Sequence, residues 1–270
     1  MSEKFHFIQE VSENPLYGKL ATVILPSGST VTIREQNGDD DEIISSFMTG
    51  NDTVGPINRF VAALILKHNY KFSDKSDVLT PKEVLNMPLR DKYFILMTSR
   101  IFSISDNIKF NWDWQNGRPE VPYEEDLLQY MWDYNKEFPY QGDIDYFKHR
   151  IQPYPENQAC IEVNLSSGKK VRYYLLDGHG ESYIMGLADS DKSINTPIRA
   201  RRLEIFDNGN WMKVESFKVF KSYEMAELRD SINTYDKPFD GLTDLHNPYT
   251  NETVSIPLLA IPDFFFPREI

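Results

Sequence analysis

The chain has 270 residues and a net charge of −12, and 40% of its residues are hydrophobic. This composition predicts a globular protein with one large domain or two ordinary ones. The acidic balance argues against nucleic acid or an anionic membrane as the main partner, because both bind clustered Lys and Arg. Residues 1–10 are charged and no apolar run reaches the roughly 18–20 residues of a membrane span, so we expect a soluble protein made in the cytoplasm.

The predicted elements begin with a β-hairpin, because two β-rich runs flank Pro26-Ser27-Gly28. Apolar residues at helical spacing then predict several helices, of which the longest runs from Leu89 to Ile104. A capping box at Thr80–Glu83 starts a short helix ahead of it. The other predicted elements are helices at 43–48 and 57–65, a strand at 107–112 and a helix at 123–136.

The pattern starts again at Ile161, about 140 residues after the first hairpin. At this offset Val23 matches Val163, and the turn glycines Gly28 and Gly168 coincide. Two further matches follow: Pro56-Ile57 aligns with Pro197-Ile198 at an offset of 141, and the Leu-Arg-Asp segments 89–91 and 228–230 align at an offset of 139. The sequence therefore favours an internal duplication. The alternative is that two unrelated hairpins share a Ser-Gly turn.

We therefore predict an α+β fold of two related halves, each a hairpin-led antiparallel sheet with helices on one face. The first α+β repeat is expected in residues 1–140. A connector rich in Pro and Tyr follows in residues 141–157, and the second repeat, with an apolar C-terminal tail, occupies residues 158–270.

Metal and thiol chemistry are not expected. The five histidines have no H-x-x-x-H or H-E-x-x-H spacing, so no two imidazoles share a helix face. The single cysteine, Cys160, excludes an intrachain disulfide and a multi-thiolate metal site. We interpret it as a small buried hydrophobe in preference to a nucleophile. The sequence predicts no cofactor and no metal.

Three other segments carry side chains that could form a functional site. The acidic run 39–42 is interpreted as a solvated helix start in preference to a cation site, since its carboxylates are consecutive. Asp177-Gly178-His179 is interpreted as a tight turn in preference to a catalytic His-Asp pair. The rings of Trp112, Trp114 and Tyr123 could stack on a sugar, without an assignable carboxylate pair beside them. We therefore expect a protein that is not an enzyme.

Several short motifs carry a family resemblance. They are Leu25–Gly28 near the start, Leu89-Arg90-Asp91 heading a helix that contains Arg100, and the C-terminal segments 247–252, 256–258 and 261–267. Together they resemble the baseplate hub subunit family of contractile-tailed bacteriophages of the T-even type and of related contractile injection systems. That family often has a Cys-Pro-x-Cys knuckle where this chain reads Asn247–Thr250, so a zinc held by relatives is not expected here.

The resemblance implies a structural component of the virion tail baseplate or hub, assembled in the host cytoplasm and acting at the tail-tube end. Its implied partners are other baseplate, hub or tail-tube proteins, with self-association as a further possibility. Two alternatives stay open: a cytoplasmic tail-assembly chaperone absent from the finished particle, and a carbohydrate-binding module.

The apolar tail is the predicted partner-binding site. Phe264, Phe265, Phe266 and Pro267 lie close to the chain end, and three adjacent rings are costly to leave in water. An extended segment would point Phe264 and Phe266 to one side and Phe265 to the other. We therefore expect at least one ring to dock in a neighbouring subunit, and the alternative is docking on the tail's own domain.

Overall fold

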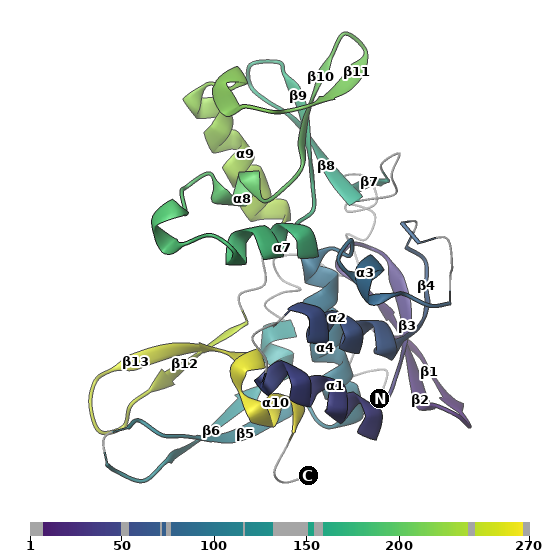
Figure 1. Cartoon of the computed structure of the whole chain (residues 1–270), viewed down its shortest axis with the longest axis vertical. Helices are drawn as coiled ribbons and strands as arrows, with labels where there is room; N and C mark the ends of the chain where they lie inside the picture. The colour runs from purple at the N-terminus through teal and green to yellow at the C-terminus, as the bar shows by residue number, and fades with distance from the viewer. Residues whose placement is uncertain are drawn as a thin grey trace.

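A computed structural model describes residues 8–49, 54–70, 72–73, 77–115, 117–131, 151–153, 159–236 and 241–266. The fold is α+β, as predicted, and its sheets are antiparallel. Two bodies lie along the long axis of the molecule (Figure 1). We call residues 8–131 together with 241–266 the first unit, and residues 151–236 the second unit, because their buried apolar side chains form two separate cores.

The first unit is built on a sheet in the order β1-β2-β3-β4. Its inward side chains, Ala21, Val23, Val31 and Ile33, share a core with apolar residues of the long helix α4. A second hairpin, β5–β6, follows α4. The bounds are β1 Ile8–Asn14, β2 Gly18–Ile24, β3 Thr30–Arg34, α1 Gly38–Thr49, α2 Val54–Leu64, β4 Ile65–His68, α3 Pro81–Val84, α4 Leu89–Ser103, β5 Asn107–Trp112 and β6 Val121–Asp126.

The prediction of a helix at 123–136 is wrong for its first four residues. Tyr123–Asp126 was expected to open a helix, but these residues pair with Asn107–Phe110 in the β5–β6 hairpin. Along β6 the side chains alternate between partly buried and exposed, which is the period of a strand on a half-covered surface. Residues 127–131 are helical, and the rest of the predicted helix lies outside the described residues.

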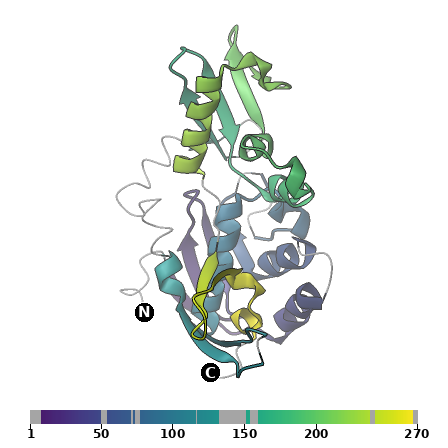
Figure 2. The ribbon, with the colours of Figure 1, turned by 90° about the vertical axis from the view of Figure 1, so that its left-hand side faces the viewer.

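The second unit is a sheet in the order β11-β10-β9-β8-β7, with α9 packed on one face (Figure 2). Val171 and Tyr173 of the sheet share its core with Leu228 and Ile232 of α9. The bounds are β7 Ile151–Pro153, β8 Ala159–Asn164, β9 Lys170–Tyr174, α7 Gly178–Met185, η1 Asp189–Asp191, α8 Thr196–Arg199, β10 Leu203–Asp207, β11 Asn210–Lys213, η2 Phe217–Val219 and α9 Ser222–Tyr235.

The hairpins β2–β3 and β8–β9 have the same register. Val23 pairs with Val31, and Val163 pairs with Val171; all five pairs of the two hairpins correspond at an offset of 140 residues. The turns also match, because Gly28 N donates to Leu25 O at 2.8 Å and Gly168 N donates to Leu165 O at 2.8 Å. Both glycines have a positive φ, of 79° and 87°, which explains why the turns require glycine.

The elements after the hairpins agree only in part. A helix starts at Gly38 and at Gly178, and the third strand, β4 or β10, pairs antiparallel with the second hairpin strand. Leu89-Arg90-Asp91, however, heads α4, whereas Leu228-Arg229-Asp230 lies within α9, so that predicted match is wrong. The internal duplication itself stays a prediction.

The C-terminal segment belongs to the first core, contrary to the predicted division. Leu245, Leu258, Phe264 and Phe265 are buried among residues of the first unit, so residues 158–270 are not one packed unit. The predicted connector also contains β7, which pairs with β8 of the second unit. The elements of this segment are β12 Leu242–His246, β13 Thr253–Pro257, η3 Leu258–Ala260 and α10 Pro262–Phe265. None of the described helices combines the length and the hydropathy that a membrane span requires.

The two units are joined where α4 begins. Leu89 N donates to Leu176 O at 2.6 Å, and Gly178 N donates to Leu85 O at 2.9 Å. A Cβ at Gly178 would lie 2.9 Å from Leu85 Cδ2, so this glycine permits a close approach of the two units. The predicted tight turn here is wrong, because Asp177 instead caps α7 by accepting from His179 N at 3.0 Å.

Charged side chains reinforce this joint. Lys92 is 2% exposed and forms an ion pair with Glu181 of α7, whose other oxygen accepts from the Tyr93 hydroxyl at 2.8 Å. Asp91, beside Lys92, is buried in the first unit and accepts from Ser27 N at 2.9 Å and from the Tyr70 hydroxyl at 2.7 Å. Asp91 therefore binds groups of the first unit, and its neighbour Lys92 binds a group of the second.

We expect Glu181→Gln to lower the free energy of unfolding by about 3–5 kcal/mol, because it leaves the Lys92 ammonium buried without a counter-charge. Urea denaturation of the two proteins measures the loss. The matched control is Glu215→Gln, which breaks the exposed Lys213–Glu215 pair and is expected to cost about 0–1 kcal/mol. Equal losses in the two variants would show that the joint pair does not hold the units together.

Asp91 makes the stability of the protein depend on pH. Burial raises the pKa of this carboxyl from 3.8 to about 6, against the opposing effect of the hydrogen bonds from Ser27 and Tyr70. Between these two values the folded chain holds a proton that the unfolded chain releases, so stability falls as the pH rises through this interval.

Comparison of the wild type with Asp91→Asn isolates this titration. The advantage of the wild type in free energy of unfolding is expected to decrease by about 2–3 kcal/mol between pH 4 and pH 7. Urea denaturation at several pH values measures it. An advantage that is constant or that grows with pH would contradict the assignment.

Candidate protein interaction site

The predicted partner-binding tail is part of the first core. Phe264 and Phe265 are 0% and 2% exposed, and the Phe265 ring meets Phe60 of α2 edge-on at 6.0 Å between centroids. The prediction that these two rings dock in a neighbouring subunit is therefore wrong. The segment is helical, so both rings can enter one core. Phe266 is half-buried against the same core, and Pro267 lies outside the described residues.

This placement predicts unequal effects of two neighbouring substitutions. Phe264→Ala removes a fully buried ring and is expected to lower the free energy of unfolding by about 3–5 kcal/mol. Phe266→Ala, the matched control, removes a half-buried ring and should cost less than half as much. Thermal or urea denaturation compares them. A Phe264→Ala variant as stable as the wild type would show that the ring is not needed in this core.

The aromatic residues considered for sugar binding hold two hairpins together. Trp114 Nε1 donates to the Tyr123 hydroxyl at 3.0 Å, and that hydroxyl donates to His246 O of β12 at 2.7 Å. Trp112, Trp114 and Tyr123 are partly buried and pack against the first core. The structure thus places all three rings in internal contacts, and Tyr123 links the β5–β6 hairpin to β12.

The knuckle position lies at the turn of the β12–β13 hairpin. Asn247 N donates to Glu252 O at 2.9 Å, which closes the turn by a backbone hydrogen bond. The Arg118 guanidinium lies 4.5 Å from the centre of the Tyr249 ring, and this cation–π contact links the turn to the β5–β6 hairpin. Within the part of the chain that the structure describes, no three His, Cys, Asp or Glu side chains gather as metal ligands.

Cys160 is buried in β8, as its interpretation as a small hydrophobe predicts. Its side chain lies beside the buried Tyr174, to which it is opposite in the β8–β9 pairing. The thiol therefore has a packing role in the second sheet.

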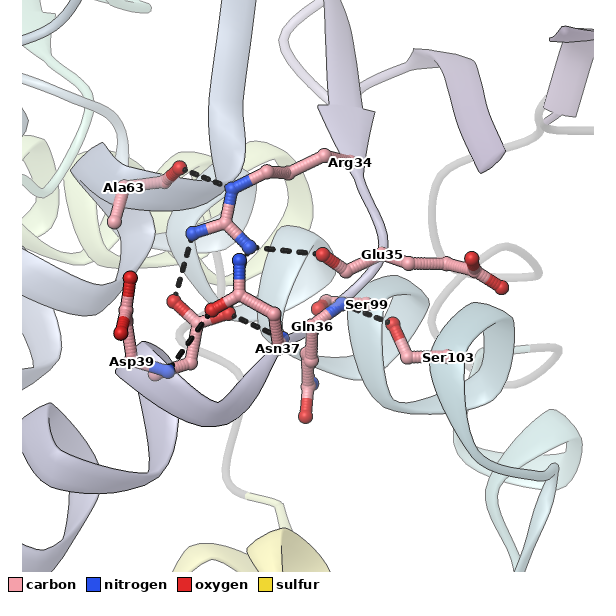
Figure 3. Close-up of polar contacts among 9 residues, drawn as sticks. Arg34, Glu35, Gln36, Asn37, Asp39, Ala63, Ser99 and Ser103 are labelled. Carbon is pink, nitrogen blue, oxygen red and sulfur yellow. Dashed lines mark hydrogen bonds and ion pairs between the residues drawn. The ribbon is translucent and has the colours of Figure 1, made fainter. Parts of the chain in front are cut away.

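A buried arginine organises the beginning of α1. Arg34 forms a bidentate pair with Asp40, at 2.7 and 2.8 Å, and its Nε donates to Ala63 O of α2 at 3.0 Å (Figure 3). Asp40 is 0% exposed, so the acidic run is not a uniformly solvated helix start as predicted. The other three residues of the run, Asp39, Asp41 and Glu42, are exposed. One guanidinium thus fixes β3, α1 and α2 to one another.

The residues after Arg34 extend this arrangement in two directions. Gln36 N donates to the Ser103 hydroxyl of α4 at 2.9 Å, and the Gln36 side chain donates to Ser99 at 2.9 Å (Figure 3). On the other side Glu35 accepts from Lys19 N and from Lys19 Nζ, both at 3.1 Å. Glu35, which directly follows β3, therefore holds the beginning of β2 in place.

The strands β1 and β2 form a hairpin that extends away from the first core (Figure 1). We call residues 10–20 of this hairpin the arm. Its turn is ordered by Asn14, whose side-chain oxygen accepts from Leu16 N at 2.8 Å and whose carbonyl accepts from Tyr17 N at 3.3 Å. The turn displays Leu16, which is 85% exposed, and Tyr17, which is 42% exposed.

The arm has the properties of a docking element. Its root is held by Glu35 and its turn by Asn14, so little conformational entropy remains to be lost when the exposed side chains bind a partner. Val11 adds a third exposed apolar side chain. The sequence prediction missed β1, although Asn14-Pro15 and Gly18 are turn signals that could have revealed a hairpin ending there.

Comparisons of the chain with known protein families, with curated proteins and with solved structures find no match. The functional argument therefore depends on the geometry of this chain.

Proposed function

We propose that the chain is a non-enzymatic structural component of a contractile-tail baseplate or hub, in a bacteriophage or a related injection system. In this proposal it mediates protein–protein assembly at the tail-tube end and resides in the tail baseplate of the virion after assembly in the host cytoplasm. Its partners are other baseplate, hub or tail-tube proteins.

The observation that carries an assembly role is the arm. An isolated exposed leucine is common on protein surfaces. Here, however, Leu16 and Tyr17 stand at the end of an ordered hairpin whose root is fixed through Glu35. Apolar side chains on a rigid projection can enter a pocket of a neighbouring subunit without reorganisation of this chain. The resemblance of the short motifs at 25–28, 89–91 and the C-terminus to the hub family supplies the context of the proposal.

Residence in the particle is tested by a mass-spectrometric inventory of purified tails, with this chain expected at a fixed ratio to the tail-tube subunit. Presence during assembly and absence from finished tails would instead identify a chaperone, for which the same arm could serve. Absence from assembly intermediates and finished tails alike would refute both assignments.

The arm is tested by Leu16→Ser combined with Tyr17→Ser. Because both side chains are exposed, we expect an unchanged melting temperature and at least about a tenfold loss of incorporation into tails, as for the removal of aromatic and apolar anchors. The matched control is Leu242→Ser, which changes an exposed leucine on β12. Normal incorporation of the arm variant, or an equal loss in the control, would exclude the arm as the docking element.

A further inference from the structure

The segment around η2 carries exposed positive charges. Lys218 lies in η2 and Lys221 follows it, and the Arg199 guanidinium of α8 lies 5.7 Å from the centre of the Phe217 ring. All three cations are exposed, and within the ranges that the structure describes none of them forms an ion pair. Because the chain as a whole carries a net charge of −12, this is a local excess of positive charge on an acidic protein.

Two apolar side chains are exposed beside these cations. Val219 is 48% exposed, and Tyr223, in the first turn of α9, is 45% exposed. The Lys221 ammonium lies 5.8 Å from the centre of the Tyr223 ring, so charge and apolar surface occur side by side. We call Arg199, Lys218, Val219, Lys221 and Tyr223 the basic corner.

The basic corner stands on a fixed support. The Phe220 side chain, within the same segment, is buried in the second core. Lys169 Nζ donates to Val219 O at 2.6 Å and forms an ion pair with Glu224 of α9 at 3.0 Å. The backbone of the corner is therefore held in place, and little conformational entropy remains to be lost when it binds a partner.

The arm is complementary to the basic corner in charge and in apolar content. Glu10 and Glu13 of β1 are exposed, and neither forms an ion pair in the described part of the chain. The same hairpin displays Leu16 and Tyr17 at its turn. Opposite charges steer two such surfaces together and fix their orientation, and apolar side chains at the contact contribute affinity by excluding water.

The arm and the basic corner lie far apart on one molecule. The arm extends from the lower half of the molecule in Figure 1, whereas α9 begins near its upper end, and Figure 2 shows the same separation along the long axis. A contact between them therefore joins two copies. Because the two surfaces differ, the contact is heterologous, and each assembly can add further copies until it closes into a ring.

We propose that the basic corner binds the arm of a second copy of this chain. Nucleic acid and anionic lipid are less suitable occupants, because the acidic remainder of the chain repels an extended polyanion. The inference rests on the proposed function in one respect, that the arm is a docking element, and it names the neighbour to which the arm docks.

Sedimentation velocity of the full-length protein over a range of concentrations tests for self-association. At about 0.1 M salt we expect reversible association that continues beyond a dimer. At about 1 M salt we expect it to weaken at least about tenfold, because the screening length falls from about 10 Å to about 3 Å.

Charge reversal locates the contact. Lys218→Glu combined with Lys221→Glu, and separately Glu10→Lys combined with Glu13→Lys, should each weaken association at least about tenfold, since like charges then face each other. The matched control combines Lys67→Glu with Lys82→Glu, two exposed lysines outside the corner, and alters the net charge as the corner variant does. It should change association by less than about twofold, and thermal denaturation verifies that all three variants fold.

An equimolar mixture of the two reversed variants gives the sharpest result. Each variant alone presents like charges on its arm and its corner. In the mixture the reversed corner can bind the wild-type arm only poorly, but it can bind the reversed arm, whose charges are now opposite to its own. We therefore expect the mixture to recover association that neither variant shows alone.

Three outcomes would overturn the proposal: a wild type that stays monomeric at all concentrations, a corner variant that associates as the wild type does, or a mixture that does not recover association. The baseplate role is judged separately, by incorporation into tails. An arm variant that is lost from tails while the wild type is monomeric would retain the docking role of the arm and would refute only the second copy as its neighbour.

Discussion

The first turn of α4 is the constraint on which the arrangement of the molecule depends. A helix begins with amide groups that have no partner within the helix. Here the amide of Leu89 is satisfied by the carbonyl of Leu176, which belongs to the other unit. Asp91 and Lys92 follow immediately, both buried and of opposite charge, and each is matched by groups from a different unit. The helix start is therefore completed only when both units are in place.

This arrangement makes the relation between the units specific as well as stable. A buried charge that loses its partner costs more free energy than the pair contributes when formed, so alternative placements of the second unit are strongly disfavoured. Arg34 has a comparable role inside the first unit, where its pair with Asp40 fixes two helices to the sheet. Under the proposed assembly role, this fixed frame serves to present the arm outward.

The sequence could predict the elements whose signals are local. The Ser-Gly turns specify both central hairpins, and the helical spacing specifies α4, because each signal acts within a few residues. The sequence could not predict in this way which unit the C-terminal segment packs against. The hydrophobicity of Phe264 and Phe265 predicts that their side chains are buried. Nothing near them in the chain, however, indicates in which core they are buried. The interpretation of 123–126 as helical failed similarly, because its strand partner determines its conformation.

The sequence could predict that apolar side chains form the candidate site, but it did not predict which residues they are. Apolar residues for partner binding were expected near the chain end, whereas the arm displays Leu16 and Tyr17 near its beginning. Leu16 lies in a turn with recognisable signals, so the arm could have been found. The burial of Phe264 and Phe265 could not be foreseen in the same way, since it depends on a core formed by residues far away in the sequence.

The return of the C-terminal segment to the first core has a consequence for biosynthesis. The second unit is inserted between two parts of the first, so its sequence is translated while the first core still lacks Leu258, Phe264 and Phe265. On the ribosome the second unit, whose core is contiguous in the chain, can close as soon as it emerges, whereas the first must wait until Leu258, Phe264 and Phe265 have also emerged. Until then the nascent first unit exposes the apolar surface of α1 and α2, which is the kind of surface that chaperones bind.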